Sequence, residues 1–312
     1  MEIRSFTLAD QRAVVKLWNI CCQFDPIDEN RFYRQAVLDE NFDPTLALCA
    51  FEKDRLIGFI LGMHRQFPYL ERGLQKEKGW ICVLFVDASC RNQGIGTALC
   101  THVENLLKEK GTKEIILGSY SPGYFFWGLD ENNYPDAARF FAHRSYVFGN
   151  LHYSMGRDLH GYEMSDPLKE RLAQALKNGY TFQNFKISDS LELLNFLKLE
   201  FGAGWKGNAL AGMRNNTATD CQIVVRNPQG TICGWCARAI DGNPMRFGPI
   251  GMAEAERNSH LGSVLLAVQM EQMVQKGIYH MFFITTDEPG RRFYERSGLR
   301  IIRTSRDCIK VL

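Results

Sequence analysis

The stretch Trp80–Lys113 decides how the rest of this chain is interpreted. It holds the apolar run ICVLFV at residues 81–86, the polar turn DASC at 87–90, and then RNQGIG at 91–96. Apolar residues recur at helical spacing from residue 95 to residue 107, and Lys110-Gly111 is typical of a helix C-terminus. The free N–H groups and dipole of a helix that follows a glycine turn favour a bound anion. This order of strand, glycine turn and helix predicts a site for a phosphorylated cofactor.

The spacing of the glycines narrows the kind of cofactor. A dinucleotide loop needs a third glycine where Leu99 stands, and a P-loop needs a Gly-Lys-Ser/Thr sequence that is absent here. The pattern Arg-x-x-Gly-x-Gly at residues 91–96 resembles the acyl-coenzyme A loop of the GNAT acetyltransferase superfamily; an ordinary strand–turn–helix is the alternative. The resemblance implies acetyl-CoA as cosubstrate. Its contacts would be backbone N–H groups of Leu84, Phe85 and Val86 for the pantetheine arm, followed by Arg91, Asn92, Gln93, Gly94, Ile95, Gly96 and Thr97.

Length and composition limit the class of protein. The 312 residues favour two domains, and an apolar content of 45% with 23% charged residues is typical of a globular protein with sizeable cores. A net charge of +2 gives no support for nucleic acid or membrane partners. Because no signal peptide or membrane-spanning run is recognised, we expect a cytoplasmic protein.

Cysteine usage predicts buried free thiols in a reducing compartment, because most of the 10 cysteines fall inside apolar strand or helix patterns. Cys233-Gly-Trp-Cys236 has the spacing of a redox pair or half a zinc site, which is the alternative. Its flanks have the pattern of a strand, and no second Cys/His pair is well placed. We therefore expect no metal.

The first half of the chain predicts the element order β-α-α-β-β-β-α-β-α-β, and the second half repeats it. Displacement by 166 residues places Gly96 on Gly262 and Leu99 on Leu265, with no gap from residue 80 to residue 117. Beyond this point the first half carries about 13 extra residues in its Tyr120–Tyr134 loop. The fold class is therefore α/β, or α+β with a mixed sheet, as two tandem GNAT-like domains. We place them at residues 1–159, with the intact loop, and 180–312, with a partly degenerate loop, joined by a linking helix within 160–179.

The two halves differ at two positions that matter for acyl transfer. The family often has a tyrosine as proton donor for the leaving thiolate, within a pattern close to Phe-Tyr-x-x-x-Gly-Phe. Residues 293–299 of the second half match this pattern and make Tyr294 the candidate acid, whereas Phe141 occupies that position in the first half. Conversely, His260 replaces the first loop glycine in the second half. The alternatives are that Tyr294 is only a packed aromatic residue, and that His260 still meets phosphate.

The aromatic loop, residues Tyr120–Tyr134, resembles a segment found in a subset of tandem GNAT proteins. We expect it to wall the acceptor pocket, with Tyr120 and Asp130 as substrate contacts and Tyr124 as a candidate proton donor for the first domain. The alternative is a hydrophobic lid that packs on the other domain.

The resemblance predicts an N-acetyltransferase that moves an acetyl group from acetyl-CoA to the primary amine of a small acceptor. The alternatives are a non-catalytic acyl-CoA-binding or scaffold protein, and a peptide or protein acetyltransferase. The expected assembly is either a monomer, in which the two domains pair as a pseudo-dimer, or a homodimer.

Overall fold

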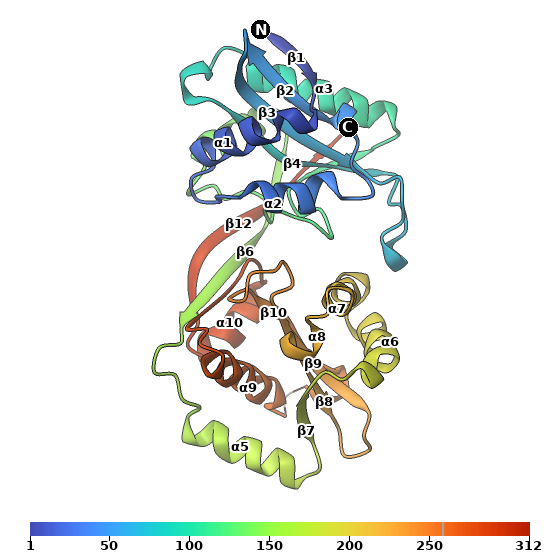
Figure 1. The fold of residues 1–312 in the computed structure, drawn as a ribbon, viewed down its shortest axis with the longest axis vertical. Helices are drawn as coiled ribbons and strands as arrows, with labels where there is room; N and C mark the ends of the chain where they lie inside the picture. The colour runs from blue at the N-terminus through green and yellow to red at the C-terminus, as the bar shows by residue number, and fades with distance from the viewer. Residues whose placement is uncertain (258) are drawn as a thin grey trace. The chain divides into compact units, whose positions relative to one another are not determined.

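A computed structural model describes residues 1–257 and 259–312. The predicted correspondence of Asn92 to Asn258 lies outside these residues. The chain divides into two compact units (Figure 1), of which unit 1 comprises Met1–His152 with Thr304–Leu312, and unit 2 comprises Tyr153–Arg303. Both chain ends therefore belong to unit 1.

Unit 1 is built on a mixed sheet in which β4 is central. Its strands are β1 (Glu2–Ser5), β2 (Ala47–Glu52), β3 (Arg55–His64), β4 (Lys78–Val86), β5 (Glu114–Leu117), the start of β6 (Val147–Asp158) and the end of β12 (Arg300–Val311). Their order is β1-β2-β3-β4-β5-β12-β6. The strands pair antiparallel from β1 to β4, whereas β4 and β5 are parallel because α3 crosses over between them.

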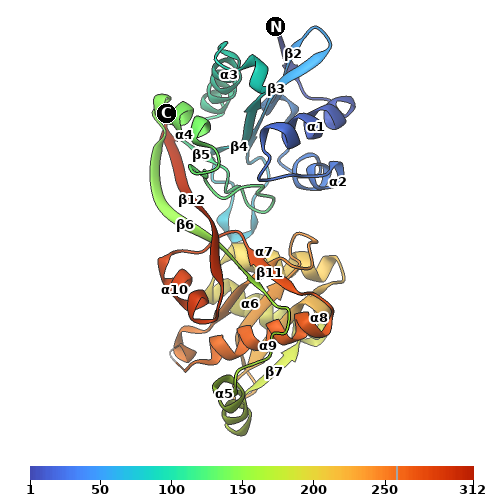
Figure 2. The same cartoon turned by 90° about the vertical axis from the view of Figure 1, so that its left-hand side faces the viewer.

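Helices cover both faces of this sheet (Figure 2). One face carries α1 (Gln11–Cys21) and α2 (Glu29–Phe32, continued by a π-helical turn Tyr33–Val37), and the other carries α3 (Ile95–Glu109) and α4 (Pro135–His143). The second predicted helix is thus α-helical over only one turn. The buried strand β3 serves both cores, since Phe59 belongs to the apolar cluster that contains Trp18 of α1, and Ile60 to the cluster that contains Leu99 of α3.

The last strand of the chain completes the sheet of unit 1. β12 pairs antiparallel with β5 through Ile309 and Ile116, and β6 lies on its other side. Cys308 is fully buried, and Lys310 Nζ lies 3.0 Å from a carboxylate oxygen of Glu104 on α3. The C-terminal strand therefore contributes to the core of unit 1 through Cys308.

Glu104 holds this strand within a buried polar cluster. Its carboxylate, only 6% exposed, accepts from Arg144 Nη2 at 2.6 Å, the Tyr146 hydroxyl at 2.9 Å and Lys310. Burial raises the pKa of this carboxyl, but the hydrogen bonds from Arg144 and Lys310 outweigh burial, so its pKa lies below the ordinary value of 4.5.

Because the folded pKa of Glu104 lies below its unfolded value, its stabilisation is complete above about pH 4.5 and is lost as the pH falls below that value. We expect the free energy of unfolding of the wild type to decrease on acidification in this range, and Glu104→Gln to weaken that dependence while lowering stability at pH 7. Urea unfolding between pH 3 and pH 7, followed by tryptophan fluorescence, measures both slopes. Equal slopes would contradict the assignment.

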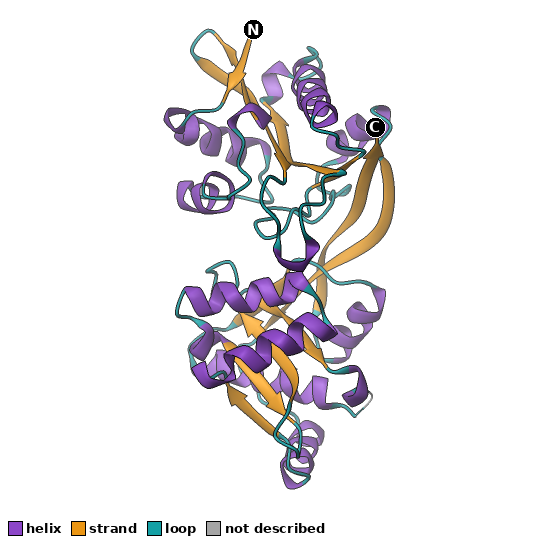
Figure 3. Ribbon diagram, turned by 90° about the vertical axis from the view of Figure 1, so that its right-hand side faces the viewer, coloured by secondary structure: helices purple, strands orange, loops and turns teal. Residues whose placement is uncertain are grey.

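Unit 2 contains α5 (Asp166–Lys177), α6 (Ser190–Glu200), α7 (Ala203–Arg214), α8 (Ala218–Cys221), α9 (Leu261–Gln275) and α10 (Glu288–Arg296). Its four-stranded sheet has the order β10-β9-β8-β7, with β7 (Thr181–Asn184), β8 (Gln222–Arg226), β9 (Ile232–Arg238) and β10 (Phe247–Met252). β11 (His280–Phe283) pairs with the second half of β6. Strands again lie between helices (Figure 3).

The predicted repeat is confirmed at the level of whole elements. α3 begins at Ile95 and β5 at Glu114, and displacement by 166 residues gives Leu261 and His280, the first residues of α9 and β11. The turn Ala88–Cys90 likewise maps onto Glu254–Glu256. The predicted fold class of two tandem α/β domains is therefore correct: the large sheet is mixed, and strands β7–β10 of unit 2 pair antiparallel.

The boundaries of the two units differ from those of the predicted domains. Sequence order suggested 1–159 and 180–312, whereas packing divides the chain within β6, after His152, and returns Thr304–Leu312 to unit 1. The predicted linking helix is α5, which packs on α9 within unit 2 through Leu168, Leu172 and Ala175. After α5, β7 runs from Thr181 to Asn184, and a 3₁₀ turn follows at Ile187–Asp189.

All 10 cysteines are free, and all except the half-buried Cys21 are buried. Cys233 and Cys236 lie within β9, as the strand interpretation predicted, and burial raises the pKa of the Cys233 thiol to about 12.

No cluster of three potential metal ligands occurs among the residues described. None of the helices within residues 1–257 and 259–312 has both the length and the apolar character needed to cross a membrane.

Candidate functional site

The carboxyl half of β4 has an edge that no neighbouring strand covers within the described residues. β5 pairs with β4 only from Lys78 to Ile81, and the Gly118 N–H then closes the pairing by donating to the Ile81 carbonyl at 2.9 Å. β4 continues to Val86 with β3 as its partner. We call the backbone of residues 82–86 on the side away from β3 the open edge. β5 therefore diverges from β4 beyond Ile81 and leaves this edge uncovered.

The register decides which backbone groups face the open edge. The Asp87 N–H donates to the Ile57 carbonyl of β3 at 2.8 Å, and alternation along an antiparallel pair then directs Phe85 toward β3 as well. Leu84 and Val86 direct their N–H and C=O groups toward the open edge. The Val86 carbonyl accepts from Arg91 Nε at 3.2 Å, which agrees with this orientation. Of the three predicted strand residues, Phe85 thus contributes a buried core side chain rather than an open backbone group.

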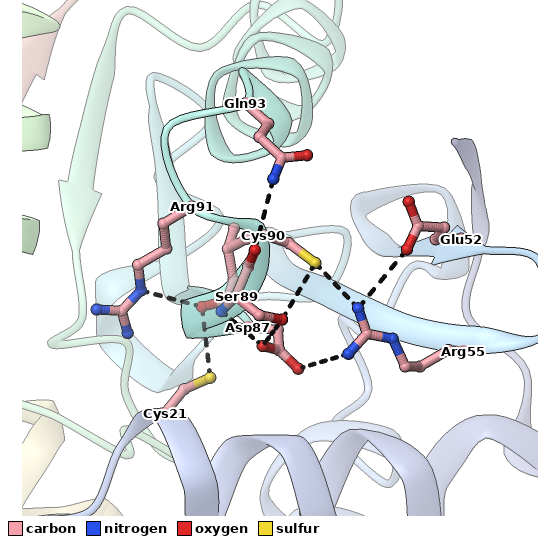
Figure 4. Close-up of polar contacts among 9 residues, drawn as sticks. Cys21, Glu52, Arg55, Asp87, Ser89, Cys90, Arg91 and Gln93 are labelled. Carbon is pink, nitrogen blue, oxygen red and sulfur yellow. Dashed lines mark hydrogen bonds and ion pairs between the residues drawn. The ribbon is translucent and has the colours of Figure 1, made fainter.

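The open edge leads directly into the loop and the first turn of α3 (Figure 4). Asp87 accepts from the Ser89 N–H at 2.9 Å and lies 3.4 Å from Arg55, which fixes the turn between strand and loop. Residues Arg91–Gly94 are exposed. Gly94 immediately precedes α3 in the left-handed conformation, with φ of 81°, and no side chain caps the helix. The N–H groups of the first turn are consequently directed to whatever occupies the space before the helix.

Gly96 is not required by the packing of unit 1. A Cβ at this helical position would meet Phe140 at 3.6 Å and Val86 at 3.7 Å, both ordinary contacts. Glycine within a helix costs roughly 0.5–1 kcal/mol relative to alanine. The absence of a side chain therefore has a cost that no neighbouring protein atom explains, and close approach of a ligand to the backbone would explain it.

Cys21 also lies at the open edge, and sequence reasoning missed it. Its thiol is 3.5 Å from the Val86 carbonyl although α1 precedes β4 by dozens of residues. Burial raises the pKa of this thiol. No local pattern links Cys21 to the loop, so only the packing of α1 against β4 could place it there.

The residue before α9 has the same backbone conformation as the residue before α3. His260 immediately precedes α9 in the left-handed conformation, with φ of 63°, as Gly94 precedes α3. A residue with a Cβ is disfavoured in this conformation by about 1–2 kcal/mol. A Cβ at Gly262 would meet only ordinary contacts, 3.7 Å from Met252 and Phe293, as at Gly96. Unit 2 thus keeps this form of helix start but has an imidazole where unit 1 has its first loop glycine.

Tyr294 lies in α10 and packs within the core of unit 2. Its ring centroid is 4.3 Å from that of Phe283 and 5.0 Å from that of Phe293. Burial raises the pKa of its phenol well above the ordinary value of 10. A phenol that stays protonated suits a proton donor, and the same packing suits a core residue, so the role of Tyr294 stays a prediction.

The structure separates the three residues predicted in the aromatic loop. Tyr120 is fully buried, and its hydroxyl donates to Asp39 at 2.9 Å and accepts from Asn41 at 3.0 Å. Asp130 is buried and accepts from the N–H groups of Asn132 and Asn133, so it organises the turn. Both side chains are used in packing of unit 1, which does not favour them as substrate contacts.

Tyr124 is half-buried, and its ring lies edge-on to Trp127 with 5.4 Å between centroids. Trp127 forms an antiparallel bridge with Gly118, at the point where β4 and β5 part. The loop also folds onto the α1 face, where Phe126 stacks on Trp18 at 5.6 Å. Of the three predicted residues, Tyr124 is therefore the one best placed beside the open edge.

Comparison with known proteins agrees with this geometry. Residues 12–123, which contain the open edge and loop, match the acetyltransferase (GNAT) family. The chain is also 30% identical to an acetyltransferase from Pectobacterium atrosepticum over 117 residues, 38% of this chain and 74% of that protein. The chain belongs to the GNAT acetyltransferase family.

Two solved structures show the tandem fold over the whole chain. A glucosamine N-acetyltransferase region of a fungal multi-domain GH3 β-N-acetylglucosaminidase has a TM-score of 0.83 at 20% identity, covering 99% of this chain and 38% of that one. A tandem GNAT protein from the clavulanic acid biosynthesis pathway has a TM-score of 0.70 at 13% identity, covering 99% of this chain and 98% of that one. At these identities the likeness concerns the fold.

Proposed function

We propose that this GNAT protein transfers an acetyl group from acetyl-CoA, bound in unit 1, to the primary amine of a small acceptor. The observation that carries the proposal is the continuity of the open edge with the uncapped first turn of α3. Leu84 and Val86 offer backbone groups to an amide-bearing arm, and the turn after Gly94 offers N–H groups to a diphosphate. Acetyl-CoA contains both features in this order.

The chemistry requires a thioester held in place and an amine delivered to its carbonyl carbon. A backbone N–H of the open edge would donate to the thioester oxygen as it gains negative charge. The aromatic loop meets β5 where that edge begins, through the bridge between Trp127 and Gly118, and Tyr124 lies half-buried beside Trp127. Arg91 lies 3.4 Å from Asp136 and adds a cation beside the phosphate-binding turn.

The proposal is tested by release of CoA thiol from acetyl-CoA in the presence of primary amines. A panel should include glucosamine, because the fungal relative is described as a glucosamine N-acetyltransferase, together with an alkyl diamine, an amino acid and a short peptide. We expect acetyl-CoA to bind and at least one small amine to raise thiol release above the rate without amine. Binding without transfer to any amine would favour the non-catalytic alternative, and transfer to the peptide alone would favour a peptide acetyltransferase.

A further inference from the structure

Arg65, the residue that follows β3, carries a buried positive charge. It is only 2% exposed. Its Nη2 donates to the Ser121 carbonyl at 2.7 Å, and its Nε donates to Oε1 of Gln75 at 3.3 Å. The guanidinium carbon also lies near three aromatic rings, at 5.1, 5.0 and 4.9 Å from the centroids of Tyr69, Trp80 and Tyr120. These neighbours are neutral, so they hold the guanidinium in place without balancing its charge.

One end of this guanidinium has no partner. Nη1 of Arg65 is buried and donates to no acceptor in the described part of the chain. The carboxylate that acts on Arg65 from a distance, Asp39, instead accepts from the Tyr120 hydroxyl at 2.9 Å and the Asn41 N–H at 2.8 Å. Burial lowers the pKa of the guanidinium, because the charged form is costly away from water. An anionic group at Nη1 would supply both the acceptor and the counter-ion.

A second arginine makes the same place more positive. Nη1 of Arg72 donates to the Ser121 hydroxyl oxygen at 3.4 Å, and its guanidinium lies 5.8 Å from the centroid of Tyr69. Arg65 contacts both of these residues as well. Arg72 is exposed, whereas Tyr69 and Ser121 are half-buried. We call Arg65, Arg72, Tyr69 and Ser121 the arginine cluster, which reaches the molecular surface at Arg72.

The arginine cluster lies next to the start of the open edge. Trp80, whose ring contacts Arg65, precedes Cys82 by two residues on β4, and two strand residues span about 7 Å. The side chains of Trp80 and Cys82 belong to the same apolar cluster, on the α1 face of the sheet. Tyr120 follows closely after Gly118, whose N–H closes the pairing of β5 with β4. A small molecule can therefore extend from the arginine cluster to an acyl group held at the open edge.

The aromatic loop adjoins the arginine cluster on another side. Burial raises the pKa of the Tyr69 phenol, and Arg72, Arg65 and Tyr124 also act on it electrostatically. Tyr124 in turn lies beside Trp127, which bridges to the residue after β5. The predicted wall of the acceptor pocket and the arginine cluster are therefore continuous.

We propose that Arg65, assisted by Arg72, binds the carboxylate of the acceptor, so that the acceptor is an amine that carries a carboxylate, as an amino acid does. This inference rests on the proposed acetyl transfer and names the class of acceptor. A planar guanidinium matches a carboxylate in shape and charge, and Nη1 is the part of it that is not already engaged. Fixing the carboxylate at one end of the molecule orients the amine at its other end toward the thioester.

The test measures how strongly each protein prefers an amino acid to its carboxamide, as a ratio of kcat/KM values in the thiol-release assay. The pairs are glycine with glycinamide and L-lysine with L-lysinamide, which differ only in the negative charge of the carboxylate. We expect Arg65→Gln to lower the ratio by at least about tenfold, the loss typical of a hydrogen bond to a charged group, with less than about threefold change toward the amides. Arg72→Gln should lower it by less, and Arg65→Lys should retain part of it.

Arg4→Gln is the matched control for loss of a packed arginine. The Arg4 guanidinium also lies over an aromatic ring, 4.4 Å from the centroid of Phe51, but it donates to both carboxylate oxygens of Asp10. That variant should keep the ratio of the wild type, and circular dichroism checks the fold of every variant. A ratio within about twofold of the wild type in Arg65→Gln, or equal losses with both members of a pair, would overturn the proposal. If Arg65→Gln does not fold, unchanged ratios in both Arg65→Lys and Arg72→Gln would overturn it.

Failure of the proposed function gives a different result. Titration calorimetry of L-lysine and glycine in the presence of CoA requires no acetyl transfer. Amino-acid binding that is lost in Arg65→Gln, in a protein that transfers no acetyl group, would support the carboxylate site and refute the proposed function. Acetyl transfer to amines with a ratio that does not depend on Arg65 would support the proposed function and refute the carboxylate site.

Discussion

Replacing Gly96 with glutamate is expected to abolish acetyl-CoA binding while the chain stays folded. The helical φ and ψ of Gly96 suit any residue, and a Cβ meets only ordinary contacts with Phe140 and Val86. A carboxylate in the first turn even favours the helix, because it faces the positive end of the dipole. The same carboxylate would occupy the turn that the diphosphate needs and repel it. Like charges in contact cost several kcal/mol, so affinity should fall by at least about 100-fold.

Titration calorimetry with acetyl-CoA measures this change, and circular dichroism checks the fold. Gly262→Glu is the matched control, because Gly262 occupies the corresponding position of α9 and its Cβ would meet similar contacts. We expect that variant to leave one binding site unchanged. A double variant, Gly94→Glu with Gly96→Glu, should also lose binding. If Gly262→Glu loses binding and Gly96→Glu keeps it, the cofactor belongs to unit 2, and the assignment to unit 1 is wrong.

Removal of the chain beyond Arg303 is expected to unfold unit 1 although every residue of the loop is retained. The truncation takes away the strand between β5 and β6, the buried Cys308 and the Lys310 ammonium beside Glu104. Glu104 keeps its hydrogen bond from Arg144 but loses the one from Lys310, and a hydrogen bond to a charged group is worth about 1.5–3 kcal/mol, before the lost strand pairing and core burial are counted. The stability of a domain is about 5–15 kcal/mol, so unit 1 should not remain folded.

The readouts are thermal unfolding by circular dichroism and acetyl-CoA binding by calorimetry. A chain that lacks only Leu312 is the control, because it retains the pairing of Ile309 with Ile116 and the Lys310–Glu104 contact. We expect that control to melt and bind as the full chain does. A truncated chain with unchanged melting and unchanged binding would show that residues 1–152 form a domain by themselves, as the predicted boundary at residue 159 suggested.

The sequence by itself determined the repeated architecture and the position of the loop. Apolar periodicity, the glycines at 94 and 96 and a displacement of 166 residues are local signals, because neighbouring residues set helix spacing, strand alternation and turn conformation. These signals also located the carboxyl half of β4. They could not separate Phe85 from Leu84 and Val86, since the direction of each backbone group depends on the register with β3.

Only the tertiary structure decided which residues meet across long separations in the chain. Sequence order assigned the final strand to the second domain, whereas pairing with β5 places Thr304–Leu312 in unit 1. The return of this C-terminal strand to unit 1 also places Asp307 beside His152 and Lys310 beside Glu104. No local pattern encodes these contacts, because β6 and β12 each contribute residues to both units. Strand pairing and burial of apolar side chains in each core then decide which residues meet.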